Sequence, residues 1–146
     1  MTTELGADRG THNKKIVDEF IQALFTRGEL DAVDRYLDPG FVNHDPDFPG
    51  APEGPEGMRQ AAAMVRAGAP NWRSDLHQLV AEDDLVVERF TASGTHTGVL
   101  MGAPPSGRRI VLDGINIFRL DGDRIVERWG QLDTLGLLRQ LGLVPG

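Results

Sequence analysis

The residues best suited to chemistry are polar side chains at the ends of segments that otherwise resemble apolar strands. Trp129, Gln131 and Asp133 alternate at the end of the last such segment, and in a strand alternate residues share one face. His96 closes the second long segment. A buried Asp133 would have a raised pKa and could act as a general base. His96 could then donate a hydrogen bond to a developing oxyanion.

Two other groups could line the same site. Asn43 and His44 follow a predicted turn at Gly40. Arg119 shares one face of the third predicted strand with Asp113, Ile115 and Ile117. We predict substrate contacts from Asn43, His44, Arg119, Trp129 and Gln131.

Each of these residues also has an ordinary structural role open to it. Asp133 precedes a closing helix and could simply cap it, and His96 could be a histidine at a loop edge. Asn43 and His44 could satisfy backbone groups in a turn. Arg119 could be an ion-pair partner at a strand end. His44, Asp45 and Asp47 are a weak candidate for metal ligation because they lie in one loop, so we predict no metal site.

Several kinds of catalytic and cofactor sites are excluded by composition and motif. The chain has no cysteine, which removes disulfides, thiolate nucleophiles and cysteine-bound metals. It has no G-x-S-x-G, H-E-x-x-H or P-loop sequence. Gly102 and Gly107 flank Pro104 and Pro105, and these prolines lack the N–H groups that a phosphate cradle needs. These absences exclude cysteine-dependent sites and the phosphate-binding and zinc-binding motifs named above.

Charge and hydropathy limit the partners. With 15 Lys and Arg against 22 Asp and Glu, the formal net charge is -7. A nucleic-acid-binding protein usually has a basic excess or a basic stripe, and an anionic membrane surface would repel this balance. No apolar run approaches the roughly 18 residues of a membrane span. The first ten residues lack the apolar core of a signal peptide. We expect a cytoplasmic protein whose partner is a hydrophobic small molecule.

The elements that must position these residues change character along the chain. Residues 1–11 are predicted to be a flexible arm, and Thr11 or Asn13 caps a helix that runs to residue 25. A short helix follows from Asp31, then a turn at Asp38-Pro39-Gly40 and a loop rich in Pro and Gly. A third helix begins at Pro55, where a missing N–H costs nothing. Four strands are predicted at 72–81, 85–97, 110–120 and 124–132, before a closing helix at 135–141.

Helices followed by consecutive strands indicate an α+β fold formed by one domain, residues 1–146. Asp121-Gly122 predicts a tight hairpin, while segment 98–109 is a longer loop expected at the mouth of a pocket. A curved sheet with helices on its concave side leaves a hollow where a small ligand would bind.

Four motifs in this order resemble the SnoaL-like polyketide cyclases. They are Phe41-Val42-Asn43-His44-Asp45-Pro46, Gly94-Thr95-His96-Thr97-Gly98, Gly102-Ala103-Pro104-Pro105-Ser106-Gly107 and Gly122-Asp123-Arg124-Ile125-Val126-Glu127-Arg128-Trp129. Asp133 and the closing Leu138-Arg139-Gln140-Leu141-Gly142 follow in the family order. The resemblance covers about residues 13–142, nearly the whole chain.

The resemblance implies a nuclear transport factor 2-like cone, in which helices pack on a strongly bent antiparallel sheet, and a homodimer. It also implies a cofactor-free aldol ring closure on a polyketide ester, with Asp133 as acid/base and Asn43 at the pocket. The family's cyclases carry polar Gln and His on the strand where this chain has Ile117 and Arg119. A hydroxylation component of an aromatic polyketide pathway, a non-catalytic binding module and a hydrolase are the alternative functions on this fold.

Overall fold

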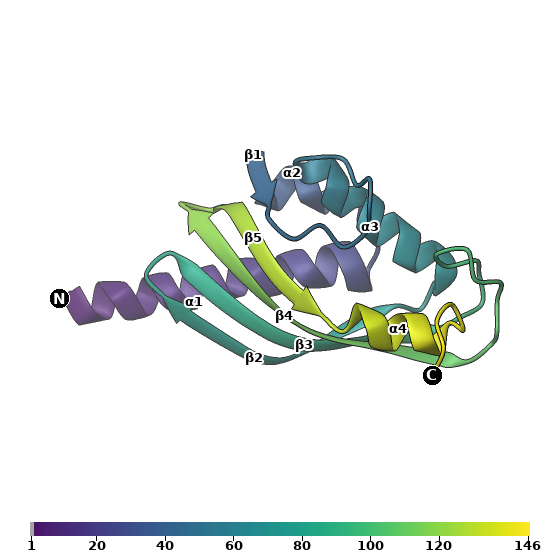
Figure 1. Cartoon of the computed structure of the whole chain (residues 1–146). Coiled ribbons are helices and arrows are strands. Elements are labelled where there is room, and N and C mark those ends of the chain that lie inside the picture. Colours follow the sequence, from purple (N-terminus) through teal and green to yellow (C-terminus); the bar gives the residue numbers. More distant parts are fainter. Residues whose placement is uncertain (1) are drawn as a thin grey trace.

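The computed structural model describes residues 2–146, with side chains from Asp8 onward. In this part of the chain most helices precede the strands, as predicted, but a fifth strand that the sequence did not predict, β1 (Leu37–Asn43), lies between the second and third helices (Figure 1). In chain order they are α1 (Thr2–Ile21), a π-helical turn (Gln22–Thr26), α2 (Ala32–Tyr36), β1 (Leu37–Asn43), α3 (Pro55–Gly68), β2 (Arg73–Glu82), β3 (Leu85–Thr95), β4 (Arg109–Asp121), β5 (Arg124–Leu132) and α4 (Thr134–Gln140).

Helix α1 begins at Thr2, not at the predicted cap Thr11 or Asn13. Most of the predicted arm therefore has helical backbone; its first residue, Met1, lies outside the described residues. Tertiary contacts explain the extension. A Cβ on Gly10 would meet Ala81 of β2 at 3.4 Å, and His12 Nε2 lies 2.7 Å from Asp123 Oδ1. The neighbouring sheet thus supports a segment whose sequence lacks an apolar stripe.

The predicted turn at Asp38-Pro39-Gly40 is wrong, because these residues lie inside β1. The pairing of β1 with β5 shifts between Leu37 and Val42, and Gly40 N donates to Asp38 Oδ2 at 2.8 Å. Residues 38–40 therefore form a local irregularity within strand β1 and do not end it. Strand β1 lies at the sheet edge, where the missing N–H of Pro39 is tolerated.

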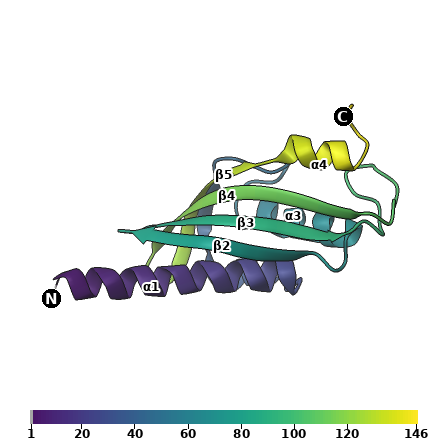
Figure 2. The same cartoon turned by 90° about the horizontal axis from the view of Figure 1, so that it is seen from below.

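The five strands form one bent sheet in the order β1-β5-β4-β3-β2. Strand β1 runs parallel to β5, whereas the other neighbours are antiparallel, so the sheet is mixed. Figure 2 shows α3 behind the sheet, α1 along its β2 edge, and a near face that no labelled helix covers. We call this uncovered side the outer face. The predicted α+β architecture, with helices against a bent sheet, is confirmed.

The inner face of the sheet carries the core in two apolar clusters. The first cluster includes Phe20 and Leu24 of the helical segment and Phe118 of β4. The second includes Trp72 and Phe90 and extends to α4. The cavity described below is lined by residues of both clusters.

Candidate active site

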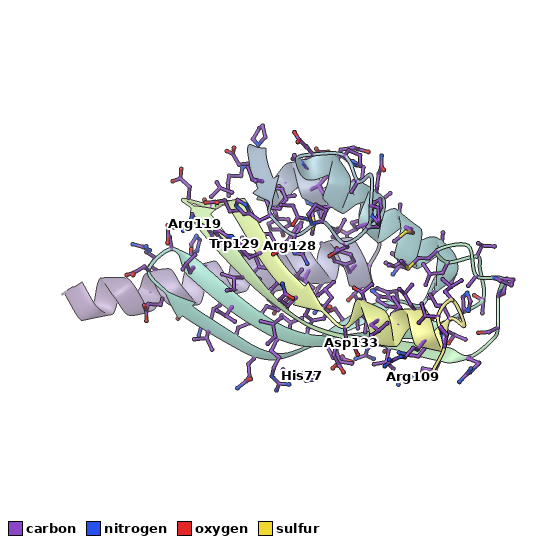
Figure 3. The ribbon with its side chains drawn as sticks, viewed as in Figure 1. His77, Arg109, Arg119, Arg128, Trp129 and Asp133 are labelled. Carbon is purple, nitrogen blue, oxygen red and sulfur yellow. The ribbon has the colours of Figure 1, made fainter. Side chains whose placement is uncertain are left out.

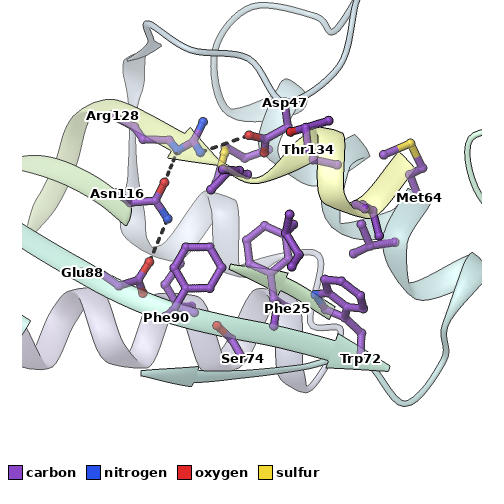
Figure 4. Close-up of a pocket in the computed structure, with 18 of the residues that line it drawn as sticks. Phe25, Asp47, Met64, Trp72, Ser74, Glu88, Phe90, Asn116, Arg128 and Thr134 are labelled. Carbon is purple, nitrogen blue, oxygen red and sulfur yellow. Dashed lines mark hydrogen bonds and ion pairs between the residues drawn. The ribbon is translucent and has the colours of Figure 1, made fainter. Parts of the chain in front are cut away.

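A mostly apolar cavity lies between the inner face of the sheet and helices α3 and α4 (Figure 4). The volume open to the centre of a water molecule is about 80 Å³. Most of its wall is apolar and includes three aromatic side chains and three methionines: Phe25, Trp72, Phe90, Met58, Met64 and Met101. Methionine side chains are flexible and polarizable, so this wall can adapt to ligands of different outline.

Three polar residues on neighbouring strands interrupt this apolar wall: Glu88 of β3, Asn116 of β4 and Arg128 of β5, which we call the polar row (Figure 4). Glu88 and Asn116 are cross-strand partners in the sheet register. Asn116 Nδ2 donates to Glu88 Oε1 at 2.8 Å, and Arg128 Nε donates to Asn116 Oδ1 at 3.0 Å. The sheet register therefore builds a continuous hydrogen-bonded chain along one end of the cavity.

The loop after β1 neutralises and fixes the guanidinium of Arg128, which is only 2% exposed. Arg128 Nη1 donates to Asn43 Oδ1 at 3.1 Å and to the carbonyl oxygen of Asp45 at 2.6 Å. Arg128 Nη2 donates to Asp47 Oδ1 at 3.0 Å. Arginine donors in a rigid planar fork suit such multiple contacts. Asn43 therefore supports the site through Arg128, and its own amide nitrogen contacts Met58 of the cavity wall.

Glu88 is a fully buried acid with one satisfied oxygen. Burial raises the pKa of its carboxyl to about 7. The hydrogen bond from Asn116 and the positive charge of Arg128 lower this pKa, and the negative charge of Asp18 raises it slightly. Among the residues whose side chains the structure describes, none hydrogen-bonds Glu88 Oε2. A proton can therefore be gained or lost at this oxygen near neutral pH.

Asp133, the predicted acid/base, lies outside the cavity. Its side chain is exposed and accepts a hydrogen bond from Gly136 N at 3.0 Å at the start of α4. The structure thus gives it the capping role that the sequence left open. The alternation that links Trp129, Gln131 and Asp133 is the one that faces away from the cavity. The cavity is lined instead by the alternate residues Arg128 and Leu132.

His96 is buried at the end of β3 without lining the cavity. Its Nδ1 lies 2.9 Å from Ser106 Oγ, and its carbonyl oxygen accepts from Ser106 N and Gly107 N. Its Nε2 has no hydrogen-bond partner among the described residues. These contacts hold loop 98–109, which brings Leu100 and Met101 to the cavity wall. His96 therefore acts on the site through this loop.

The structure brings His44, Arg119 and Trp129 together, but away from the cavity. The His44 ring stacks on Trp129 with centroids 4.8 Å apart, and the Arg119 guanidinium lies 5.7 Å from the same indole. Arg119 also pairs with Asp84 at 2.7 Å and Glu127 at 2.9 Å. Figure 3 shows Arg119 and Trp129 near one another, with Asp133 farther along at α4. Arg119 is thus an ion-pair partner. Gln131 is exposed and lies on the same side of β5 as Trp129, away from the cavity.

Glu88, Asn116 and Arg128 were not among the predicted site residues, although the sequence carried a signal for them. Glu88 and Asn116 are each the polar member of an alternating set that is otherwise apolar or glycine, and Arg128 lies between Val126 and Gly130 in its own set. In β3 the set Val86, Glu88, Phe90 and Ala92 is buried. A polar residue in the middle of such a set must be satisfied inside the protein, which marks it as a candidate for function.

Two further features concern metals and membranes. Within the described residues, no group of three His, Asp or Glu side chains is arranged to hold a metal ion. The described helices include none that is both long and apolar enough to cross a membrane.

Comparison with known proteins gives consistent matches over most of the chain. The profile of the SnoaL-like polyketide cyclase family matches residues 15–141. The nogalonic acid methyl ester cyclase of Streptomyces nogalater is 29% identical over 121 residues, covering 82% of this chain and 90% of that protein. The aklanonic acid methyl ester cyclase DnrD of Streptomyces peucetius is 30% identical over 109 residues, covering 73% and 72%. The structure of TsrD from Streptomyces laurentii is 31% identical, with a TM-score of 0.80 over 92% of this chain and 97% of TsrD.

Proposed function

Because this chain belongs to the SnoaL-like polyketide cyclase family, we propose that it closes a ring in a polyketide ester by an intramolecular aldol reaction without a cofactor. The curated relatives named above are cyclases of polyketide methyl esters, which supports ring closure over hydroxylation or simple binding. Asp133 and His96, the acid/base and oxyanion donor expected from sequence, lie outside the cavity wall, and we therefore look for the reacting groups among the residues that line it.

The observation that carries this proposal is a cavity with one polar end. An aldol closure needs a base for an acidic α-proton, a donor for the developing oxyanion, and a wall that excludes water. The polar row supplies a carboxyl, an amide and a guanidinium at one end of a wall that is mostly apolar. The aromatic and methionine side chains suit the hydrophobic rings of a polyketide.

Incubation with nogalonic acid methyl ester and aklanonic acid methyl ester, with products followed by liquid chromatography and mass spectrometry, tests this function. Ring closure by aldol addition rearranges bonds without loss of atoms, so the product should have the substrate's mass and a new retention time. Conversion should require the cavity. Ala61→Trp places a large ring at a buried cavity position of α3 and should abolish turnover, whereas Ala63→Trp, on the exposed side of the same helix, should not.

Failure of the wild-type protein to convert either ester, or equal conversion by Ala61→Trp and Ala63→Trp, would contradict the proposal. Circular dichroism of both variants checks that the tryptophan at position 61 leaves the fold intact.

We also propose a homodimer formed through the outer face of the sheet. Val80, Val87, Ile117 and Trp129 are successive cross-strand partners from β2 to β5 and form an apolar row on that face. Ile115 lies beside this row and is 45% exposed, and Val80 is 58% exposed. A contiguous apolar patch of this kind is typical of an interaction surface, and a two-fold axis would pair it with itself.

A further inference from the structure

We propose that Glu88, which lines the cavity, is the base that removes the substrate's α-proton, and that Asn116 and Arg128 are positioning residues that hold one of its oxygens and leave the other without a hydrogen-bond partner. This inference rests on the proposed ring closure. It also assigns to Glu88 of β3 the role that the resemblance gave to Asp133, the N-cap of α4.

The orientation of the Asn116 amide follows from the chemistry of Arg128. A guanidinium can only donate, so the group of Asn116 that faces Arg128 Nε at 3.0 Å is its oxygen, Oδ1. The amide nitrogen, Nδ2, must then face Glu88, and it donates to Oε1 at 2.8 Å. The fixed arginine thus makes the Asn116 amide nitrogen the donor to Glu88, which satisfies one carboxyl oxygen and leaves Oε2 without a partner.

Glu88 differs from Asp47, the other carboxylate of the cavity wall. Asp47 Oδ1 accepts directly from Arg128 Nη2 at 3.0 Å, so its charge is matched by the guanidinium. Glu88 makes no direct hydrogen bond to Arg128 and is linked to it by hydrogen bonds through Asn116. Its Oε2 has no hydrogen-bond partner among the described residues. A buried, unpaired carboxyl oxygen on an apolar wall is strongly basic for a carboxylate. Glu88 is therefore the better proton acceptor of the two.

The reaction balances with this one carboxylate. Glu88 Oε2 takes the proton from the carbon between two carbonyls, and the electron pair of that C–H bond becomes the enolate. The enolate carbon then forms a bond to the ketone carbon in the same molecule. The electrons of the ketone π bond move to its oxygen, and that oxygen takes the proton back from Glu88. No oxidant, reductant or second reactant is consumed, and the carboxylate is restored.

The charged groups around Glu88 fit this cycle. Burial raises its pKa to about 7, and Asp18 raises it further, while the hydrogen bond from Asn116 and the charge of Arg128 lower it. A base works best when its pKa lies near the operating pH. We therefore expect kcat/KM to rise with pH through about 7 as Glu88 loses its proton.

Glu88→Gln tests the assignment through two reactions of the same methyl esters. The first is exchange of the α-proton in D₂O, followed by NMR, and the second is ring closure. Glutamine keeps the shape and the acceptor oxygen for Asn116 but removes the base. Both rates should fall about 10²–10⁴-fold, the usual contribution of general acid–base catalysis. Glu82→Gln makes the same chemical change at an exposed position of β2 and should leave both rates unchanged.

The two readouts separate this inference from the proposed function. Wild-type exchange without ring closure, lost in Glu88→Gln, would support the base and reject the cyclase. Ring closure at the wild-type rate by folded Glu88→Gln would reject the base and keep the cyclase. If neither ester reacts, the ¹³C signal of the Glu88 carboxyl decides, because titration near the ordinary glutamate range would overturn the proposal.

Asn116→Ala tests the positioning role. Without the amide donor, the pKa of Glu88 should rise, because that hydrogen bond stabilises the carboxylate. The midpoint of the kcat/KM profile should therefore move to higher pH. A lower rate with an unmoved midpoint would mean that Asn116 only fills space.

Discussion

Glu88 links the stability of the fold to pH. Its folded pKa is about 7, above the ordinary value of 4.5, because burial disfavours the charged form. The folded state therefore holds this proton more tightly than the unfolded chain does. The resulting stability is fully present below about pH 4.5 and is lost as pH rises through about 7. At 1.36 kcal/mol per unit of pKa, the change is at most about 3 kcal/mol.

Urea unfolding of the wild type and Glu88→Gln between about pH 4 and pH 8 measures this effect. The wild type should lose stability relative to Glu88→Gln as pH rises across that window. Glu82→Gln, exposed on β2, should follow the wild-type curve. Curves for wild type and Glu88→Gln that stay parallel would show that Glu88 has an ordinary pKa in the folded protein.

Asp133 is the residue on which sequence and structure differ most. In the structure it accepts from Gly136 N as the N-cap of α4, and asparagine caps nearly as well as aspartate. Asp133→Asn should therefore keep near-normal stability and near-normal ring-closing activity. Asp133→Ala should lose about 1 kcal/mol through the missing cap. A folded Asp133→Asn protein with activity reduced about 10²–10⁴-fold would instead establish Asp133 as the acid/base.

At the scale of elements, strand β5 can carry Arg128 only because Gly130 leaves room for it. A Cβ at Gly130 would collide with the Arg128 guanidinium and would lie 2.7 Å from Asn116 Oδ1. Gly130→Ala should therefore displace a buried charge from its partners, at a cost of about 3–5 kcal/mol. Gly10→Ala is the matched control, since its new methyl group meets Ala81 at an ordinary 3.4 Å and alanine favours a helix.

Thermal and urea denaturation of the two variants measure the difference. Equal stability of Gly130→Ala and wild type would mean that Arg128 can move without loss, and that the polar row is not held as the structure shows.

At the scale of the whole molecule, the outer face predicts the oligomeric state. Light scattering should give twice the 15.9 kDa of one chain at micromolar concentration. Ile115→Lys places a charge beside the apolar row from Val80 to Trp129 and should shift the protein to monomer. Val99→Lys changes a residue that is 62% exposed in loop 98–109 and should leave the mass unchanged. A wild-type monomer would reject the dimer.

Local patterns in the sequence already determined most of the elements. The alternation of residues 124–132 predicted β5 within its observed bounds, and Pro55 marked the first residue of α3. Asp121-Gly122 predicted the hairpin, with Gly122 at φ +61° as such a turn requires. Alternation also grouped Trp129 with Gln131, and Ile115 with Ile117 and Arg119. These features depend on neighbours along the chain, so the sequence contains them.

Only the tertiary structure decided which group faces the cavity. Alternation states that two residues share a face, but the side on which helices pack depends on contacts between distant segments. Trp129 and Arg128 are adjacent in sequence, yet one lies on the outer face and the other in the polar row. The contacts of Arg128 with Asn43, Asp45 and Asp47 span more than 80 positions. Folding therefore placed Glu88, Asn116 and Arg128 at the cavity wall, whereas sequence spacing alone had favoured Asp133.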